Sequence, residues 1–358
     1  MKTQILRINP FDTFFFRDGK PFSMGDETWA DGVFPPAPSV IYGALRSLWL
    51  SQQEHGFSDE NIEASERLVI KGVFLEFNTD IALPTPIDVI KDKSDKKTKP
   101  DTFTLSPIAN KIISNINFEK IAIQQEIEYI EEFEGSFLPF FEYENYLTGN
   151  VNQLQVNADF LVDESKVGIG RQFGTRTTRQ SSLYRVDMKR FKRNNISIIV
   201  ECAGLDFSGN TLAKFGAEGK ASAISIINDS QYTEIISPDS FEDNHFKLCI
   251  ATPTIFKNHG WLPEWIDPIT LRGNYNGLKL QLQTAVLGKP ISIGGFNMKT
   301  TKHVKKGPKT MYKAVPVGSV YHFKLLEGNM EQVKATFHYQ SISEHKAHEG
   351  FGITYVSK

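Results

Sequence analysis

Short apolar runs of strand type recur along the whole sequence, and they limit the fold more than any other feature. The runs at 67–78, 195–203 and 278–286 are rich in apolar and β-branched residues, and the last alternates between apolar and polar residues, as half-buried strands do. Glycine-containing turns separate many of the runs. Further strand-like runs lie at 2–16, where Pro10 interrupts the pattern, at 182–200, 247–256, 288–295 and 314–326, and after Gly350 and Gly352.

Only one long segment has the spacing of a helix. Ser39 is a favourable N-cap, and four apolar residues after it fall on one helical face. These are Ile41, Leu45, Leu48 and Trp49. Many strands, few long helices and glycine-rich loops together predict an α+β fold. The strand–helix–strand order at the start suits a ferredoxin-like β-α-β-β-α-β unit, which recurs in RNA-binding proteins with one open sheet face.

Composition indicates an ordinary globular protein. The chain has 358 residues, of which 40% are hydrophobic and 23% charged, enough for two domains with separate cores. A glycine-containing segment at 204–219 predicts a boundary near its start, with an N-terminal domain at 1–205 and a C-terminal domain at 206–358. Cys202 and Cys249 stand in apolar runs, which favours two buried thiols over a disulfide framework or a zinc site.

Charge and hydropathy limit the class of partner. The net charge of -2 argues against a generic polyanion binder, so a nucleic-acid site must be a local patch. The chain starts without an apolar signal core, and no run reaches transmembrane length. A soluble, cytoplasmic protein that does not enter a membrane is therefore expected.

The strongest local anomaly in charge is the segment 164–193. From Lys166 to Arg193 it has nine Lys or Arg and a single acid, Asp187. Its first half resembles an exposed loop or hairpin and its second half a strand. Such a segment could follow a phosphate backbone and stack unpaired bases, or it could be a hairpin whose charges only keep an edge strand soluble. A second basic patch, at 299–313, has six lysines and no acid.

The segment 118–146 has the opposite charge, with eight Glu against Lys120 alone. A helix over 126–133 followed by an irregular aromatic segment is one interpretation, and the sequence leaves it open. The segment is either a protein-contact surface or a solvated insertion. Before it, the lysine-rich segment 91–100 is expected to be a polar loop.

Several glycine clusters could bring backbone N–H groups close to phosphates, or they could be ordinary turns between strands. They lie at 168–174, 216–219, 288–295 and 350–352. Known catalytic patterns are missing: the sequence has no GxSxG, HExxH or P-loop, and His345 and His348 have no third metal ligand nearby. His259 could serve as the general base of a metal-independent ribonuclease, although no acid partner can be identified. Asp18 beside Arg17 is more simply a turn cap or an ion pair than a catalytic carboxylate.

Eight segments carry a resemblance to one family, in order and over nearly the whole chain. They are PFDTFFFRDGKPF at 10–22, FPPAPSVIYGALR at 34–46, ESKVGIGR at 164–171, SLYRVD at 182–187, FGAEGKAS at 215–222, ATPTIFKNHGWLP at 251–263, AVLGKPISIGGF at 285–296 and KAVPVGSVYHF at 313–323. Together they resemble the third subunit of the Cmr complex, the type III-B CRISPR effector of antiviral defence, in the RAMP superfamily. The acidic segment and the lysine-rich loop lie outside the resemblance.

The resemblance implies two fused ferredoxin-like domains and no catalysis. From the residues themselves, no metal or cofactor is expected. It implies that the chain grips the 5′ handle of the crRNA, contacts the large polymerase-palm subunit and adjoins a backbone RAMP subunit. Unpaired nucleotides need phosphate contacts for hold and base contacts for identity. We expect phosphate contacts from Arg171, Arg176, Arg179 and Arg185, then from Arg17, Arg46, Lys220 and Lys289; close backbone approach at Gly168, Gly170, Gly294 and Gly295; and base stacking on Phe173, Tyr184 and Phe296. The alternatives are a crRNA-processing endoribonuclease that uses His259 and a pure protein scaffold.

Overall fold

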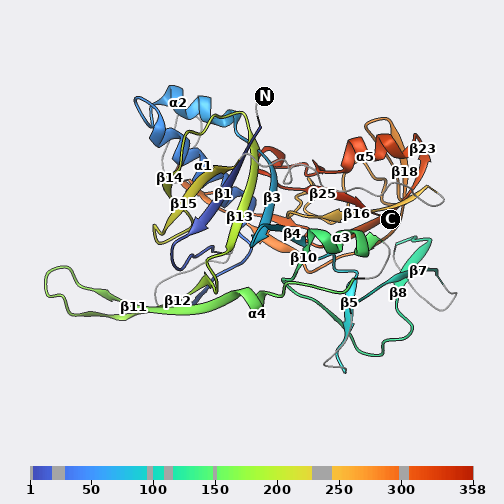
Figure 1. Cartoon of the computed structure of the whole chain (residues 1–358), viewed down its shortest axis with the longest axis horizontal. Helices are drawn as coiled ribbons and strands as arrows, with labels where there is room; N and C mark the ends of the chain where they lie inside the picture. The colour runs from blue at the N-terminus through green and yellow to red at the C-terminus, as the bar shows by residue number, and fades with distance from the viewer. Residues whose placement is uncertain are drawn as a thin grey trace.

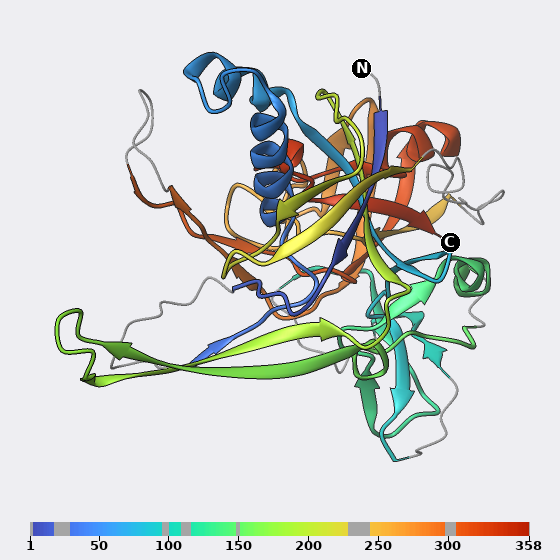
Figure 2. The same ribbon diagram turned by 60° about the vertical axis from the view of Figure 1, so that its left-hand side comes forward.

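The computed structural model describes residues 3–17, 29–94, 100–108, 116–147, 151–227, 244–297 and 306–357. The turn predicted at Asp18 and residues 95–99 of the lysine-rich loop lie outside these ranges. The fold is mixed α+β, with many strands and few helices, as the sequence predicts. Two sheets form the body, and a long hairpin projects from it (Figures 1 and 2).

The first sheet is antiparallel and has the strand order β10-β4-β3-β13-β1-β15-β14. Its strands are β1 (Thr3–Pro10), β3 (Val69–Phe77), β4 (Asp80–Pro84), β10 (Phe137–Pro139), β13 (Ile196–Ala203), β14 (Thr211–Lys214) and β15 (Ala221–Ile227). The strands predicted at the start of the chain, at 67–78 and at 195–203 are confirmed. β1 lies between β13 and β15.

The predicted long helix is α1 (Pro38–Gln52), whose four apolar residues are buried in one core with β1 and β13. The helix begins at Pro38 with Ala37 as N-cap, so the prediction of Ser39 as N-cap is wrong. Proline is favoured at the first helical position because it has no N–H to leave unpaired and its φ is already helical. Two short helices follow, α2 (Asp59–Ala64), capped by Ser58, and η1 (Ser65–Arg67).

The second sheet is also antiparallel, with the order β17-β18-β23-β16-β25-β24. Its strands are β16 (His245–Ile250), β17 (Arg272–Tyr275), β18 (Leu278–Val286), β23 (Val320–Glu327), β24 (Gln340–Ser341) and β25 (Ile353–Ser357). Helix α5 (Met330–Phe337) packs on it through Val333 and Phe337 and begins with a capping box between Asn329 and Gln332. The 3-10 helix η3 (Ala347–Glu349) precedes β25.

The two sheets share a hydrophobic core between them. In β1 and β13, Leu6 and Ile198 face α1, whereas Ile5 and Ile199 belong to a cluster that also contains Tyr355 of β25. Every residue of β13 is buried for this reason. The layers are therefore α1, the first sheet, the second sheet and α5. Separating the two sheets would expose the apolar face that each turns toward the other.

The chain passes from one sheet to the other later than the predicted boundary near residue 205. β15 pairs with β1 over Ile5–Pro10, and β14 pairs with β15. The first sheet thus extends to Ile227, and the second begins at His245. The glycine-containing segment at 204–219 lies within the first sheet's part of the chain. The division into two domains stays a prediction.

The acidic segment belongs to an insertion between β4 and β10 and continues into α3. The insertion contains β5 (Val89–Asp92), β6 (Asp101–Thr102), β7 (Thr104–Pro107), β8 (Lys120–Ile123) and β9 (Ile130–Glu132), and α3 (Phe140–Leu147) follows β10. The interpretation of 126–133 as helix is wrong, because β9 pairs with β5 there. The helix forms instead in the aromatic part, where it buries Tyr143 and Tyr146.

The hairpin consists of β11 (Leu161–Arg171) and β12 (Thr178–Phe191), preceded by the short helix α4 (Asn157–Phe160). β2 (Trp29–Asp31) pairs in parallel with β12 near the root. Both halves of the predicted basic segment are thus strands, joined by a turn. Two small strand pairs lie on the same side of the molecule as α1: β19 (Ile291–Ile293) with β22 (Tyr312–Ala314), and β20 (Phe296–Asn297) with β21 (Gly307–Pro308) (Figure 2). No helix among the described residues has the length and apolar character to cross a membrane.

Candidate nucleic-acid interface

The register of the hairpin divides its side chains between two faces. Residues that pair across strands share a face, so Lys166, Gly168, Tyr184 and Val186 lie on one side. Val186 and Met188 on this side are buried against Phe15 and Ala30, and Tyr184 packs on the cluster. The opposite face carries Arg185 together with the exposed side chains of Val167, Ile169 and Leu183. One face therefore fixes the root to the body, and the other is open.

Cations at the root of the hairpin are paired with acids. Lys189 forms an ion pair with Asp163, and the Nε atom of Arg190 lies 2.8 Å from Oε2 of Glu164. The Nζ atom of Lys166 lies 3.3 Å from Oε2 of Glu218, in the loop before β15. Asp163, Glu164 and Glu218 lie outside the run of 166–193 in which only one acid occurs. The charge at the root is therefore largely compensated.

The tip of the hairpin carries uncompensated charge. Arg171 and Arg176 are exposed, and no acidic side chain in the described part of the chain forms an ion pair with either. Between them, the side chain of Phe173 is fully exposed, with a relative accessible surface of 105%. Gln172 closes the turn: its N–H donates to Thr177 O at 2.9 Å, and its carbonyl accepts from Arg176 N–H at 3.0 Å. Arg179 lies in β12, but its side chain is outside the described part.

Arg185 is held in place by three neighbours. Its Nε donates to Asp187 Oδ1 at 2.8 Å, its Nη2 donates to Ser165 Oγ at 2.7 Å, and its guanidinium lies 4.2 Å from the ring centre of Trp29. Burial acts to raise the pKa of Asp187, but hydrogen bonds from Ser165, Trp29 and Arg185 outweigh it and lower the pKa. Asp187 is thus a carboxylate that neutralises Arg185. Trp29 is absent from the sequence-based candidates because only the parallel pairing of β2 with β12 brings it here.

The space above Gly168 is occupied. A Cβ atom added to Gly168 would lie 2.2 Å from Cζ of Tyr184, whose ring covers the glycine. Gly168 therefore leaves room for the ring of Tyr184, and the ring face that is turned toward Gly168 is covered and cannot stack on a base. Gly170 lies at the irregular register between Ile169 and Arg171, where the hairpin departs from regular pairing.

Packing accounts for several of the remaining glycines. Gly216, Gly350 and Gly352 have positive φ angles of 80°, 93° and 75°. An added Cβ would lie 2.7 Å or less from Phe15 O, from Ile70 and from Ser343, respectively. The alternative of ordinary turns therefore suffices for these three positions.

The other candidate residues separate into two groups. Near the root of the hairpin, Arg17 forms an isolated β-bridge with Gly32, and Lys220 Nζ lies 3.2 Å from Oδ2 of Asp12. The second group is far from the hairpin in sequence and includes Lys309, which the sequence-based candidates lack. Lys309 lies against Gly295, its N–H donates to Gly295 O at 2.9 Å, and its side chain shares a pocket with Arg46 of α1. Gly294, Gly295 and Phe296 follow β19 directly, and Lys289 is exposed just before that strand.

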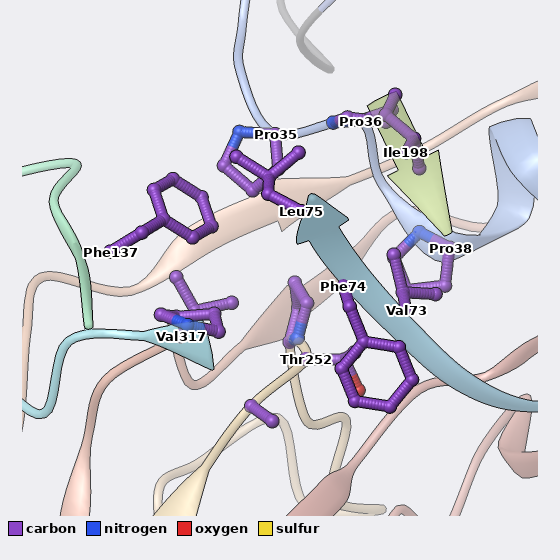
Figure 3. Close-up of a pocket in the computed structure, with 13 residues that line it drawn as sticks. Pro35, Pro36, Pro38, Val73, Phe74, Leu75, Phe137, Ile198, Thr252 and Val317 are labelled. Carbon is purple, nitrogen blue, oxygen red and sulfur yellow. The ribbon is translucent and has the colours of Figure 1, made fainter. Parts of the chain in front are cut away.

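A small apolar cavity lies between the two sheets (Figure 3). Pro35, Pro38, Phe74, Phe137 and Val317 are among its lining residues, and its volume is about 30 Å³, roughly the space of one water molecule. Such a cavity is a packing defect of the shared core and cannot hold a nucleotide.

The described residues hold no cluster of His, Cys, Asp and Glu that could bind a metal ion. Cys202 and Cys249 are free, and burial raises the pKa of each thiol to about 12, so both are unreactive core residues, as predicted. His259 lies in a turn, where its ring centre stands 5.8 Å from that of Tyr312. The ring centre of His345 stands 4.9 Å from that of the same tyrosine.

These features define a class: a strand-rich α+β protein whose shared core supports a projecting hairpin with a cationic tip. A family described as "CRISPR-associated protein (Cas_Cmr3)" matches residues 6–356. The chain therefore belongs to this family of CRISPR-associated proteins, and the resemblance found in its motifs is confirmed.

Solved structures give matches over most of the chain at low identity. A chain in the cryo-EM structure of the Type III-B Cmr-beta bound to cognate target RNA and AMPPnP is 17% identical, with a TM-score of 0.48, covering 89% of this chain and 86% of that one. A chain of Cmr-beta bound to cognate target RNA is 15% identical, with a TM-score of 0.48 and coverages of 93% and 92%. A chain of the Csm3-Csm4 subcomplex of the type III-A CRISPR-Cas interference complex is 12% identical, with a TM-score of 0.38 and coverages of 92% and 96%. No curated protein matches.

Proposed function

We propose that the chain is a noncatalytic subunit of a type III-B CRISPR effector complex that binds the 5′ handle of the crRNA. In this proposal it also bridges the large palm-domain subunit to the backbone RAMP subunits. Membership of the Cas_Cmr3 family supports the place in the complex. The observation that carries the RNA-binding role is the hairpin tip, where Arg171 and Arg176 are without acidic partners among the described side chains and Phe173 is fully exposed.

The chemistry of the tip fits single-stranded RNA. Guanidinium groups bind phosphate oxygens, and an exposed aromatic ring stacks on an unpaired base whatever its identity. A solvated hairpin that serves only to block edge-to-edge pairing needs charge at its edges but no exposed phenylalanine at its end. The compensated root and the uncompensated tip also explain how a chain with a net charge of -2 can bind a polyanion locally.

We further propose that each sheet is built on a ferredoxin-like unit. The order β15-β1-β13-β3 in the first sheet and β25-β16-β23-β18 in the second both follow the 4-1-3-2 order of a β-α-β-β-α-β chain. The first unit has α1 between its first two strands, and the second has α5 between its last two. Under this proposal β15 is the fourth strand of the first unit, so the domain boundary lies after Ile227.

Binding of labelled crRNA handle, measured by fluorescence anisotropy against a scrambled strand over a salt series, tests the RNA-binding role. About five phosphate contacts give a log–log salt slope near -3.5 on single-stranded RNA. Phe173→Ala is expected to weaken binding about 5- to 150-fold, because base stacking contributes roughly 1–3 kcal/mol, and to leave the slope unchanged. Absence of binding at low salt would favour the pure protein scaffold.

One observation favours a second candidate, the endoribonuclease. His259 and His345 both lie beside Tyr312, and metal-independent RNA cleavage needs a general base and a general acid. Incubation of the purified protein with repeat RNA and EDTA decides between the candidates. Cleavage that is lost in both His259→Ala and His345→Ala would establish the enzyme, and intact RNA is the result that the proposed noncatalytic role requires.

A further inference from the structure

A polar pocket of about 440 Å³ opens beside the N-terminal half of α1. Its lining includes Tyr42, Gly43 and Arg46 of α1, Glu66 of η1, His348 of η3 and Lys309. Three parts of the chain that are distant in sequence thus meet here. The volume is in the range of sites for small molecules, which sets this pocket apart from the cavity between the sheets.

Two cations lie at the pocket, and one of them has a fixed orientation. Arg46 donates from Nε and Nη2 to Ser65 Oγ at 2.9 and 2.7 Å, and from Nη2 to Ile62 O at 3.2 Å. These bonds leave Nη1 available to a ligand. The stem of Lys309 lies against Gly295, with Cδ 3.2 Å from the position of an added Cβ, and no acid of the described residues pairs with its ammonium group.

The two acids that line the pocket, Glu66 and Glu349, differ in whether a cation is paired with them. Glu349 is engaged by Lys346, whose Nζ lies 3.0 and 3.1 Å from its two carboxylate oxygens. Glu66 has no such partner among the described side chains. The ring of Tyr42 lies 5.4 Å from that of His348, edge to face, and 5.6 Å from the guanidinium of Arg46. The pocket thus offers cations, a carboxylate acceptor and aromatic surface together.

We propose that this pocket binds one cytidine nucleotide unit, with its phosphate at Arg46 and Lys309 and the exocyclic amino group of its base directed toward Glu66. A bare anion would be repelled by the carboxylate of Glu66. A nucleotide offers an anionic phosphate to the two cations and an amino donor to the carboxylate. Carboxylates accept hydrogen bonds from the exocyclic amino group of cytosine, and a uracil would turn its O4 toward the same carboxylate. The proposal rests on the proposed function only for the source of the nucleotide, which is the RNA held by the chain.

Gly43 gives the sharpest variant. A Cβ added to Gly43 meets no atom within 4 Å, because the space beside it is the pocket. Gly43→Leu therefore has room for its Cβ and places an apolar side chain in the pocket, and leucine is a better helix former than glycine. Ser47→Leu is the matched control, since Ser47 is exposed on the same helix and does not line the pocket.

Isothermal titration calorimetry of the full chain with CMP, UMP, cytidine and inorganic phosphate tests the proposal. CMP is expected to bind at least about 5-fold more tightly than UMP and more tightly than cytidine or phosphate alone. Gly43→Leu is expected to abolish the CMP signal with an unchanged or raised thermal midpoint, while Ser47→Leu retains it. Lys309→Met is expected to weaken CMP toward the affinity of cytidine, and it provides a second test if Gly43→Leu misfolds.

Equal affinity for CMP and UMP, equal affinity for CMP and cytidine, or full CMP binding by Gly43→Leu would each overturn the proposal. Its failure can be distinguished from that of the proposed function. CMP binding without affinity for handle RNA would support the pocket proposal and contradict the proposed binding of the handle. Handle binding that depends on Arg171 and Arg176, without any CMP binding, would contradict only the pocket proposal.

Discussion

Replacing Arg171 with alanine and Arg176 with asparagine in one chain is expected to weaken binding of crRNA handle about 100-fold at moderate salt. Each arginine is exposed and without an acidic partner among the described side chains, so each is free to contact a phosphate. Two charge-assisted contacts of roughly 1.5 kcal/mol each sum to ~3 kcal/mol, and 1.4 kcal/mol is a factor of ten. The log–log salt slope should become less steep by about 1.4, or about 0.7 per lost contact on a single strand.

The choice of residues separates this effect from damage to the fold. Arg176 has a φ of 54°, a conformation that asparagine tolerates better than alanine. The matched control is Lys189→Ala with Arg190→Ala, which removes the same charge from the root of the hairpin, where both cations are paired with Asp163 and Glu164. The control variant should bind the crRNA handle with the same log–log salt slope as the unchanged chain. If tip and root variants change the slope equally, then net charge binds the RNA and the tip has no special role.

The hairpin could be predicted from sequence because its information is local. The charge run, the glycines and the turn all lie within 164–193, and β-hairpin pairing joins neighbours in sequence. Which cations are available could not be predicted in this way. Arg185 is occupied by Trp29 and Asp187, and Lys166 by Glu218, and these contacts depend on tertiary packing.

The strands and the long helix follow from apolar spacing, but the topology does not. β15 follows a glycine-containing segment, and only its pairing with β1 places it in the first sheet. The pocket illustrates the same limit. Arg46 is a candidate through its motif, whereas Lys309 and His348 join it only because two distant segments fold against α1.

The insertion is fastened to the second sheet by a buried ionic contact, and breaking it is expected to cost about 3–5 kcal/mol. Asp88 is fully buried and accepts hydrogen bonds from Tyr146 Oη at 3.0 and 3.2 Å and from Lys247 Nζ at 3.1 Å. Asp88→Ala leaves the mostly buried ammonium of Lys247 and the hydroxyl of Tyr146 without this partner. At roughly 2 °C per kcal/mol for a chain of this size, the thermal midpoint should fall by about 6–10 °C.

A double-mutant cycle identifies the cause of this loss. Lys247→Met should also destabilise, because it leaves the carboxylate of Asp88 buried without its cation. The double variant Asp88→Ala/Lys247→Met should be more stable than the sum of the two single losses predicts, because no unpaired buried charge remains. The exposed pair of Lys257 and Glu264 is the control, where Lys257→Met should cost under ~1 kcal/mol. Strict additivity in the cycle would mean that Asp88 stabilises the insertion by some means other than its contact with Lys247.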